Sequence, residues 1–336
     1  MKAKVLIGIV ALLGLATGLA ACGGDDENGP VTLYSGREEE LVAPLFEQYE
    51  EETGNEVEVR YGDSAELAAT ILEEGDNTPA DVFFSQDAGA LGALEKEGLF
   101  SELDEQAIAV VDERFRSGDD RWVGVSGRAR VIAYDSRELD EADLPDSVLD
   151  LTDPEWEGRV GWAPTNASFQ AFVTALRLQE GDAAARRWLE DMEANGAVSF
   201  ESNSSTRDAI AAGEIELGLI NHYYVAQAQA EEGDDYPVEV HFTSGGDVGA
   251  LVNVAGAGVL AASDRQGAAS EFAEFLLSPQ AQRYFAAETK EYPLVDGIEA
   301  DAEIVPLSEI ESPQLDLSNL DDLQGTLTLI ERSGVL

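Results

Sequence analysis

The sequence predicts an α/β protein of two lobes, each a mostly parallel sheet flanked by helices, with a ligand-binding cleft between them. Two observations lead to this prediction. Short β-rich runs alternate with amphipathic helical stretches from Val31 onward. The pattern then occurs a second time with no long linker before it, and 336 residues suit about two domains. In such folds ligands bind at the carboxyl ends of the strands.

The first half opens with a βαβαβ pattern. We expect strands at residues 31–34, 56–60 and 81–84, and helices at 39–53 and 64–74, the first of which ends at Gly54. A long, β-rich segment follows at 122–134. Its central position predicts a strand that crosses from one lobe to the other.

The second half repeats this order. Strands are expected at 159–162, 198–200 and 216–220, and helices at 168–179, 182–195, 203–212 and from about residue 222. The expected division of the chain gives residues 31–128 and 253–305 to one lobe and residues 129–252 and 306–336 to the other.

The charge of the chain excludes one class of partner. Lys and Arg total 20 against 68 Asp and Glu, a formal charge of −48. Such a chain would be repelled by nucleic acid. We interpret most of this acidity as a surface adaptation to concentrated salt, where self-repulsion is screened. One Cys and two His exclude zinc fingers and disulfide scaffolds.

The N-terminus has the pattern of an export signal. Two lysines precede an uncharged run from Val5 to Ala21, so residues 1–21 are expected to be a signal peptide. Leu19-Ala20-Ala21-Cys22 resembles a bacterial lipobox, which predicts a lipidated Cys22; an ordinary secretory signal is the alternative. The run is short for a membrane span. Residues 22–30 would form a tether, and cleavage leaves 18 basic and 68 acidic residues, or −50.

Tyr223 and Tyr224 are the strongest candidates for metal ligands. They begin a helix directly after an expected strand, at the mouth of the cleft. A phenolate is a hard oxygen donor that suits a hard, highly charged cation, and such a cation would lower the phenol pKa from its usual ~10. Aromatic packing is the alternative for the pair.

Three loop-to-helix junctions could bind an anion. They begin at Asn166, Asn203 and Asn221, and each places free backbone N–H groups at the positive end of a helix. Ordinary N-capping explains each junction alone. Convergence of the three on one point would indicate an anion site.

These residues lie in stretches that resemble one family along nearly all the expected mature chain. The matching segments include VTLYSGREEE, WVGVSGRARVIAYD, NSSTRDAIAAGEIELGLINHYY and KEYPL. They resemble the bacterial ferric-ion-binding proteins, the substrate-binding components of iron ABC importers. The resemblance implies a periplasmic-binding-protein fold of type II, with iron(III) held in the interlobe cleft.

The resemblance also implies a ligand set. The family's paired tyrosines fall on Tyr223 and Tyr224, its histidine on Glu38 and its glutamate on Gln86. Glu38 can supply a carboxylate, whereas Gln86 is a poorer ligand and leaves Asp87 as a substitute. The positions that bind a synergistic anion, phosphate or carbonate, fall on Asn166, Ala167, Ser168, Asn203 and Asn221.

Five other side chains have two interpretations each. His222 could replace the missing imidazole, but packing is the preferred reading, and His241 is expected at the surface or in packing. Arg128 and Arg130 could face the anion or form an interlobe salt bridge. Trp162 is expected in the cleft wall or core.

The resemblance implies a binding protein and no enzymatic activity. The expected role is capture of Fe(III) and its delivery to the transmembrane subunits of an ABC permease with a cytoplasmic ATPase. The chain is expected to be a monomer, exported and held only by lipid at the outer face of the cytoplasmic membrane, or periplasmic. A binding protein for thiamine or a polyamine is the alternative. A secreted hydrolase with a carboxylate pair is a third reading, although no G-x-S-x-G motif occurs.

Overall fold

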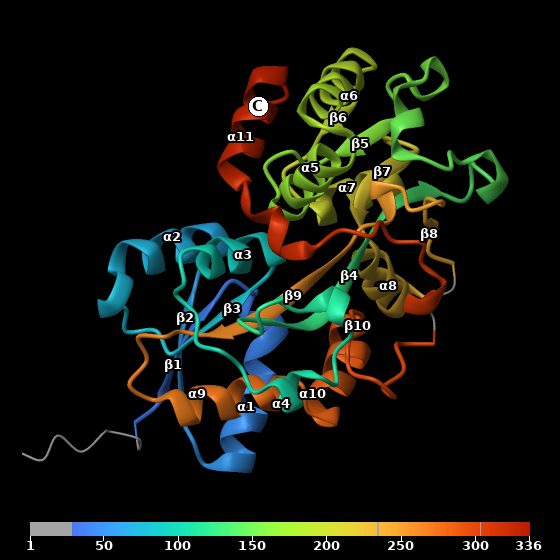
Figure 1. The fold of residues 1–336 in the computed structure, drawn as a ribbon. Helices are drawn as coiled ribbons and strands as arrows, with labels where there is room; N and C mark the ends of the chain where they lie inside the picture. Colours follow the sequence, from blue (N-terminus) through green and yellow to red (C-terminus); the bar gives the residue numbers. More distant parts are fainter. Residues whose placement is uncertain (1–28, 234, 303) are drawn as a thin grey trace, which may run out of the picture.

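The computed structural model describes residues 29–233, 235–302 and 304–336, which form an α/β molecule of two halves (Figure 1). The expected signal peptide and Cys22 lie outside the described residues, as does most of the expected tether. Among the residues described, no helix is long and apolar enough to cross a membrane.

Ten strands form one connected sheet: β1 (Val31–Ser35), β2 (Val57–Tyr61), β3 (Val82–Ser85), β4 (Val123–Asp135), β5 (Val160–Trp162), β6 (Val198–Ser199), β7 (Leu217–Asn221), β8 (Val238–His241), β9 (Val252–Val259) and β10 (Tyr292–Pro293). The α-helices of the described chain are α1 (Glu39–Thr53), α2 (Ser64–Glu74), α3 (Ala88–Lys96), α4 (Glu105–Ile108), α5 (Ala167–Glu180), α6 (Asp182–Ala194), α7 (Asn203–Ala211), α8 (His222–Glu232), α9 (Gln266–Leu276), α10 (Pro279–Tyr284) and α11 (Leu323–Ser333).

The strands run in the order β2-β1-β3-β9-β4-β7-β5-β6, with β10 and β8 also paired to β4. The expected parallel pairing is present on both sides, between β1 and its neighbours β2 and β3, and between β5 and its neighbours β6 and β7. The sheet becomes mixed at its centre because β4 and β9 join it antiparallel.

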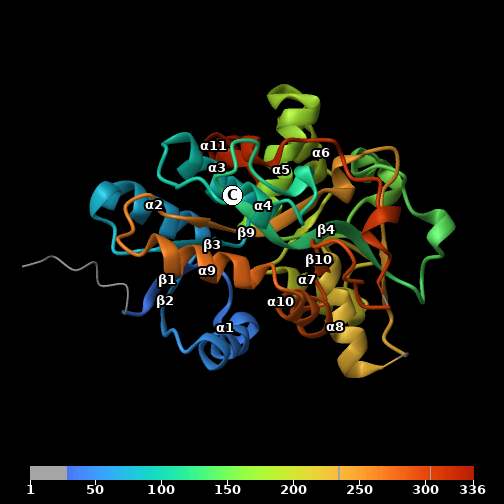
Figure 2. The same ribbon diagram turned by 60° about the horizontal axis from the view of Figure 1, so that its bottom comes forward.

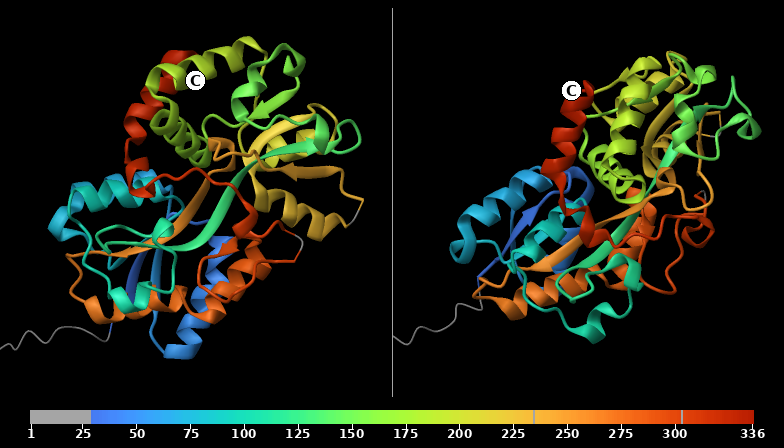
Figure 3. Two further views of the ribbon diagram at one scale, coloured as in Figure 1. Left: turned by 45° about the vertical axis from the view of Figure 1, so that its right-hand side comes forward. Right: turned by 45° about the horizontal axis from the view of Figure 1, so that its top comes forward.

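Strand β4 belongs to both halves, as expected of a crossing strand. Its residues Val123 to Ala129 pair with β9, and Arg130 to Tyr134 pair with β7. All 13 residues of β4 are buried. Figure 3 shows β4 and β9 running from one half of the molecule into the other. Residues near Ala129 and Arg130 therefore lie where the halves meet.

Helices cover both faces of the sheet because each presents an apolar stripe. In α1 the buried residues are Val42, Leu45, Phe46 and Tyr49, which follow the three-and-four spacing of one helix face. Figure 1 shows α1 and α9 below β1 and β2, with α2 and α3 above them, and in Figure 2 α1 again lies below β1 and β2. This packing fixes the strand ends from which the site residues project.

The C-terminal segment contacts both halves. A short 3₁₀ helix, η9 (Leu317–Asp321), packs on α3, where a Cβ at Gly92 would lie 2.3 Å from the carbonyl oxygen of Ser318. Helix α11 then packs on α5 and α6, and Thr174 and Thr326 hydrogen-bond at 2.7 Å (Figure 1). Glycine is needed at position 92 because a side chain would prevent this close approach.

Candidate metal centre

Tyr223 and Tyr224 lie in the first turn of α8, directly after β7. Their rings stack with centroids 4.2 Å apart and 29° between their planes. Tyr223 is buried, at 3% exposure, and Tyr224 is half-buried. Neighbouring residues of a helix point about 100° apart. The stacking therefore brings two side chains that start in different directions to one place.

His222 is a structural residue. Its Nδ1 accepts a hydrogen bond from the Ala129 backbone N–H at 3.2 Å, and its Nε2 lies 3.0 Å from the carbonyl oxygen of Lys290. Both ring nitrogens are therefore occupied in the neutral tautomer, which agrees with the packing role expected from the sequence. Burial lowers the pKa of His222 to about 4, so the ring is neutral at physiological pH.

Two buried arginines, Arg37 and Arg128, interact electrostatically with Tyr223. Nη2 of Arg37 donates to Glu291 at 2.9 Å, and Ser126 donates to the same carboxylate at 2.6 Å. Arg128 is 2% exposed and forms no ion pair within the described chain. Burial lowers the pKa of Arg128, and the nearby charge of Arg37 lowers it further.

The surroundings of Tyr223 favour its neutral form. Burial raises its pKa well above the usual value, and the neighbouring Tyr224 raises it further, while Arg128 and Arg37 act in the opposite direction. Without a metal the phenol is protonated at neutral pH. A metal ion that binds this oxygen must release a proton.

The three helix N-termini that the sequence singled out do converge. Nη1 of Arg130 lies 3.4 Å from the side-chain oxygens of Ser168, Asn203 and Asn221, which belong to the starts of α5, α7 and α8. Nη2 of Arg130 also donates to the Leu219 carbonyl at 2.7 Å.

Asn166, the N-cap of α5, closes this network. Its side-chain oxygen accepts from the backbone N–H of Ser168 at 3.0 Å and from Nδ2 of Asn203 at 3.1 Å. Ala167 is the first residue of α5. Four of the five expected anion-binding residues thus share one hydrogen-bond network centred on Arg130, and Ala167 adjoins it.

The other candidate ligands, Glu38, Gln86 and Asp87, lie outside the network around Arg130 and have separate contacts. Glu38 is exposed at the start of α1, and its side chain makes no capping hydrogen bond. The Asp87 carboxylate caps α3 by accepting from the Ala90 N–H at 3.1 Å, and its pKa is raised by burial. The backbone N–H of Gln86 donates to Ser64 at 2.9 Å. Within the described chain, no hydrogen bond joins these three residues to the tyrosines, and the same residues contain no cluster of three or more His, Cys, Asp and Glu suited to a metal.

Three other expectations have clear outcomes. Arg128 and Arg130 form no salt bridge among the described residues, so the interlobe salt bridge suggested by the sequence is wrong. Trp162 is fully buried among Phe169 and Trp188 and belongs to the core. His241 is half-buried, and its Nε2 lies 3.1 Å from the Pro145 carbonyl oxygen.

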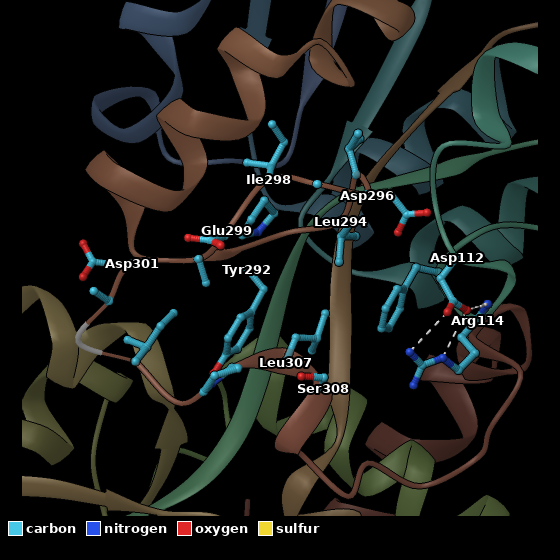
Figure 4. A pocket seen from close by; sticks show the side chains of 18 residues that line it. Asp112, Arg114, Tyr292, Leu294, Asp296, Ile298, Glu299, Asp301, Leu307 and Ser308 are labelled. Carbon is cyan, nitrogen blue, oxygen red and sulfur yellow. Dashed lines mark hydrogen bonds and ion pairs between the residues drawn. The ribbon is translucent and has the colours of Figure 1, made fainter.

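A cavity of about 610 Å³ lies elsewhere in the molecule (Figure 4). It is lined by Asp112, Arg114 and Phe115, by residues 292–302, and by Ile304, Pro306, Leu307 and Ser308. Its rim carries the Asp112–Arg114 ion pair at 3.1 Å. Neither tyrosine of the pair lines it. This cavity is therefore separate from the candidate metal centre.

Sequence reasoning missed the buried pair of Arg37 and Glu291, which are 254 positions apart. Glu291 stands in the KEYPL segment and Arg37 in VTLYSGREEE, so both belong to stretches already singled out. Each segment holds several charged residues, and nothing local to either segment indicates the other as its partner.

Comparison with known proteins finds similarity along most of the chain. Residues 77–312 match the family described as bacterial extracellular solute-binding protein. The Fe(3+)-binding periplasmic protein of Serratia marcescens is 32% identical over 343 residues and covers 100% of both chains. Iron-bound HitA from Pseudomonas aeruginosa has a TM-score of 0.85 at 33% identity, covering 91% of this chain and 99% of that one. Trichodesmium IdiA (FutA), solved with iron and citrate ligands, has a TM-score of 0.80 at 27% identity, with 91% and 99% covered.

Proposed function

Because the chain belongs to the bacterial extracellular solute-binding proteins, and within them to the ferric-iron-binding proteins, we propose that it captures iron(III) at Tyr223 and Tyr224. The observation that carries this proposal is the stacked tyrosine pair beside the network of helix N-termini. The relatives are iron-binding transport proteins, so the chain is a binding protein and not an enzyme.

Two phenolates are a suitable core for an iron(III) site. Iron(III) is a hard cation, and it replaces the proton that the buried Tyr223 otherwise keeps. The Glu38 carboxylate would add a third negative charge from the opposite half, brought in when the halves close. Gln86 and Asp87 are the weaker candidates, since the Asp87 carboxylate already caps α3.

A synergistic anion is the second part of the proposal. Arg128 and Arg130 place two buried positive charges, without ion-pair partners in the described chain, beside the tyrosines, and iron(III) would be repelled by them unless an anion lay between. Phosphate or carbonate would bind at the start of α5 to Asn166, Ala167 and Ser168, with Asn203 and Asn221 beside it and Arg128 as a further contact. Citrate, which accompanies iron in the Trichodesmium protein, is the anion to compare with them.

The same arginines argue against the alternative solutes. Thiamine and polyamines are cations, and each would meet Arg37, Arg128 and Arg130, which are all buried. Moving a cation next to buried guanidinium groups is unfavourable. We therefore retain iron with its anion as the proposed ligand.

We place the protein outside the cytoplasm, as its relatives are, and propose that Cys22 is lipidated and anchors it to the membrane. It would act as a monomer whose two lobes, 31–128 with 253–305 and 129–252 with 306–336, close on iron and present it to an ABC permease and its ATPase. The change of partner of β4 at Ala129 and Arg130 supports the first boundary. An N-terminus that is unmodified by mass spectrometry would refute the lipid anchor.

Metal analysis of protein purified without chelators, together with its visible spectrum, tests the proposed ligand. We expect iron in stoichiometric amount and a coloured protein, because phenolate bound to iron(III) absorbs visible light. A colourless protein that takes up no iron(III) from a weak chelate, with or without phosphate, would contradict the proposal.

A further inference from the structure

The cavity lined by residues 292–302 has the size of a small-molecule binding site. Its volume is about 610 Å³, within the range of roughly 300–1,000 Å³ that ligand pockets usually have. Neither Tyr223 nor Tyr224 lines it, so the capture of iron gives this cavity no role. Its walls and charges therefore have to be considered on their own.

The segment that forms most of the cavity is fastened in place. The Tyr292 hydroxyl donates to the Val305 carbonyl oxygen at 2.8 Å. Nζ of Lys290 pairs with the Asp301 carboxylate at 2.5 Å. These contacts join both ends and the middle of the segment to neighbouring chain. A ligand would thus meet walls that are already formed, which lowers the entropy cost of binding.

The walls of the cavity are mainly apolar (Figure 4). Their buried side chains include Phe115, Tyr292 and Leu294, and their half-buried ones Ile298, Ile304 and Leu307. Half-buried apolar side chains around a cavity leave hydrocarbon in contact with water. A ligand that covered this surface would gain hydrophobic free energy in proportion to the area. The body of a suitable ligand is therefore apolar.

The rim of the cavity adds negative charge. Asp296 and Glu299 are exposed, and neither forms an ion pair with any residue of the described chain. The other two carboxylates of the rim, on Asp112 and Asp301, each have a basic partner. The rim is thus left with two uncompensated negative charges. It attracts a cation and repels an anion.

Arg114 shows how a cation fits this wall. Its guanidinium carbon lies 5.0 Å from the centroid of the Phe115 ring, and Nε pairs with Asp112 at 3.1 Å. A cation over an aromatic ring is stabilised by the charge distribution of the ring. Among the described residues that line the cavity, Arg114 is the only basic one. Asp296 and Glu299 remain for a cation from outside.

We propose that this cavity binds a small organic cation with a compact apolar body, an alkylammonium or guanidinium compound. Its charge lies at Asp296 and Glu299, and its body packs against Leu294, Ile298 and Leu307. A bare metal ion fits less well, because it would leave the apolar walls uncovered and the described chain has no group of three metal-binding side chains there. The site is independent of iron and of the tyrosine pair.

Three compounds with the same rigid cage test the required charge. They are 1-adamantylammonium, the neutral 1-adamantanol and 1-adamantanecarboxylate, titrated into the iron-free mature protein by calorimetry at low salt. The ammonium should bind about fivefold more tightly than the alcohol, as expected for exposed charge pairs. The carboxylate should bind more weakly than either.

NMR of isoleucine methyl groups locates the bound compound. The methyl signals of Ile298 and Ile304, which line the cavity, should shift as the ammonium is added. The signal of Ile132, which is fully buried in β4, should stay in place. Iron-free protein is used because paramagnetic iron(III) would broaden nearby signals.

A double variant tests the two carboxylates. Asp296→Asn with Glu299→Gln should remove the preference for the ammonium and leave the affinity for the alcohol unchanged. Glu73→Gln with Asp76→Asn is the matched control, since these carboxylates are also exposed, have the same spacing and lie outside the cavity. Both double variants change the net charge equally, so general attraction to the acidic protein is the same in each. The control should keep the preference.

The variant Ala300→Trp tests the cavity itself. Ala300 is half-buried in the wall, and an indole there would occupy the space, so binding of the ammonium and the alcohol should fall at least tenfold. The melting temperature of the variant shows whether it folds normally. If it folds and binds the ammonium like the wild type, the cavity is not the site.

Three further results would overturn the proposal. These are equal affinities for the three compounds or no binding of any of them, an unchanged preference in the variant of Asp296 and Glu299, and methyl shifts only outside the cavity. All measurements are made without iron, so failure of the iron proposal does not affect them.

Discussion

The imidazole of His222 lies against the ring of Tyr292, with centroids 4.4 Å apart and 20° between the planes. Tyr292 belongs to β10, which pairs with Gly127 of β4. The same imidazole accepts the N–H of Ala129 at 3.2 Å. The start of α8, and with it the tyrosine pair, is thereby held against the neighbouring strand and loop.

The first prediction concerns pH and His222. Its pKa is about 4 in the folded protein against ~6.5 in an unfolded chain. As the pH falls, His222 takes up a proton first in the unfolded chain. The stability that neutral His222 gives to the folded protein is therefore complete above pH ~6.5 and is lost as the pH falls towards ~4. The loss should reach about 3 kcal/mol in the free energy of unfolding. Urea unfolding at successive pH values measures it.

His222→Gln is the comparison for that measurement. Glutamine can accept from Ala129 and donate to Lys290 but does not titrate, so its unfolding curves contain only the effect of the other groups. The wild type should lose more stability than this variant between pH 6.5 and 4. Parallel losses in the two proteins would show that His222 is not responsible.

The second prediction concerns the tyrosines. Phe at position 223 or 224 keeps the ring that stacks in the pair and removes the ligand oxygen. Iron(III) affinity should fall on the order of 100-fold or more, because loss of even an outer-shell partner of a metal costs about 10–100-fold. Titration with a competing chelator, followed by the phenolate band, measures the change. The melting temperature without iron should change little, and wild-type affinity in both variants would refute the ligand assignment.

The third prediction ranks the candidates of the opposite half. Glu38→Gln should weaken iron binding by about tenfold, the low end of the cost of losing a group around a metal, because one carboxylate charge is lost while both phenolate oxygens remain. Gln86→Glu should tighten binding by adding a carboxylate near the site. The same titrations decide the order, and an effect of Glu38→Gln as large as that of Tyr223→Phe would make Glu38 an equal ligand.

The sequence could predict what depends on local pattern. The crossing segment 122–134 and the tyrosine pair after β7 follow from periodicity and from the order of elements. The sequence identified three helix starts as candidates for one anion site, but only the structure shows that they converge on Arg130. The contacts of Arg37 with Glu291 could not be predicted, because they join distant positions through the tertiary fold.

The last prediction concerns that buried pair. Arg37 and Glu291 are 2% and 0% exposed in their side chains. Glu291→Gln would leave the Arg37 charge uncompensated, and breaking a buried pair costs about 3–5 kcal/mol. Chemical denaturation should therefore reveal a large loss in the free energy of unfolding.

The double variant Arg37→Met with Glu291→Leu separates lost charge from lost packing. Two apolar side chains of similar volume carry no desolvation penalty, so most of the stability should return. The pair of Arg186 and Glu190, which is 55% and 38% exposed, provides the matched control, and Glu190→Gln there should change stability little because solvent screens the pair. If Glu291→Gln proved as mild as that control, the charge of Arg37 would have to be balanced by another group within the site.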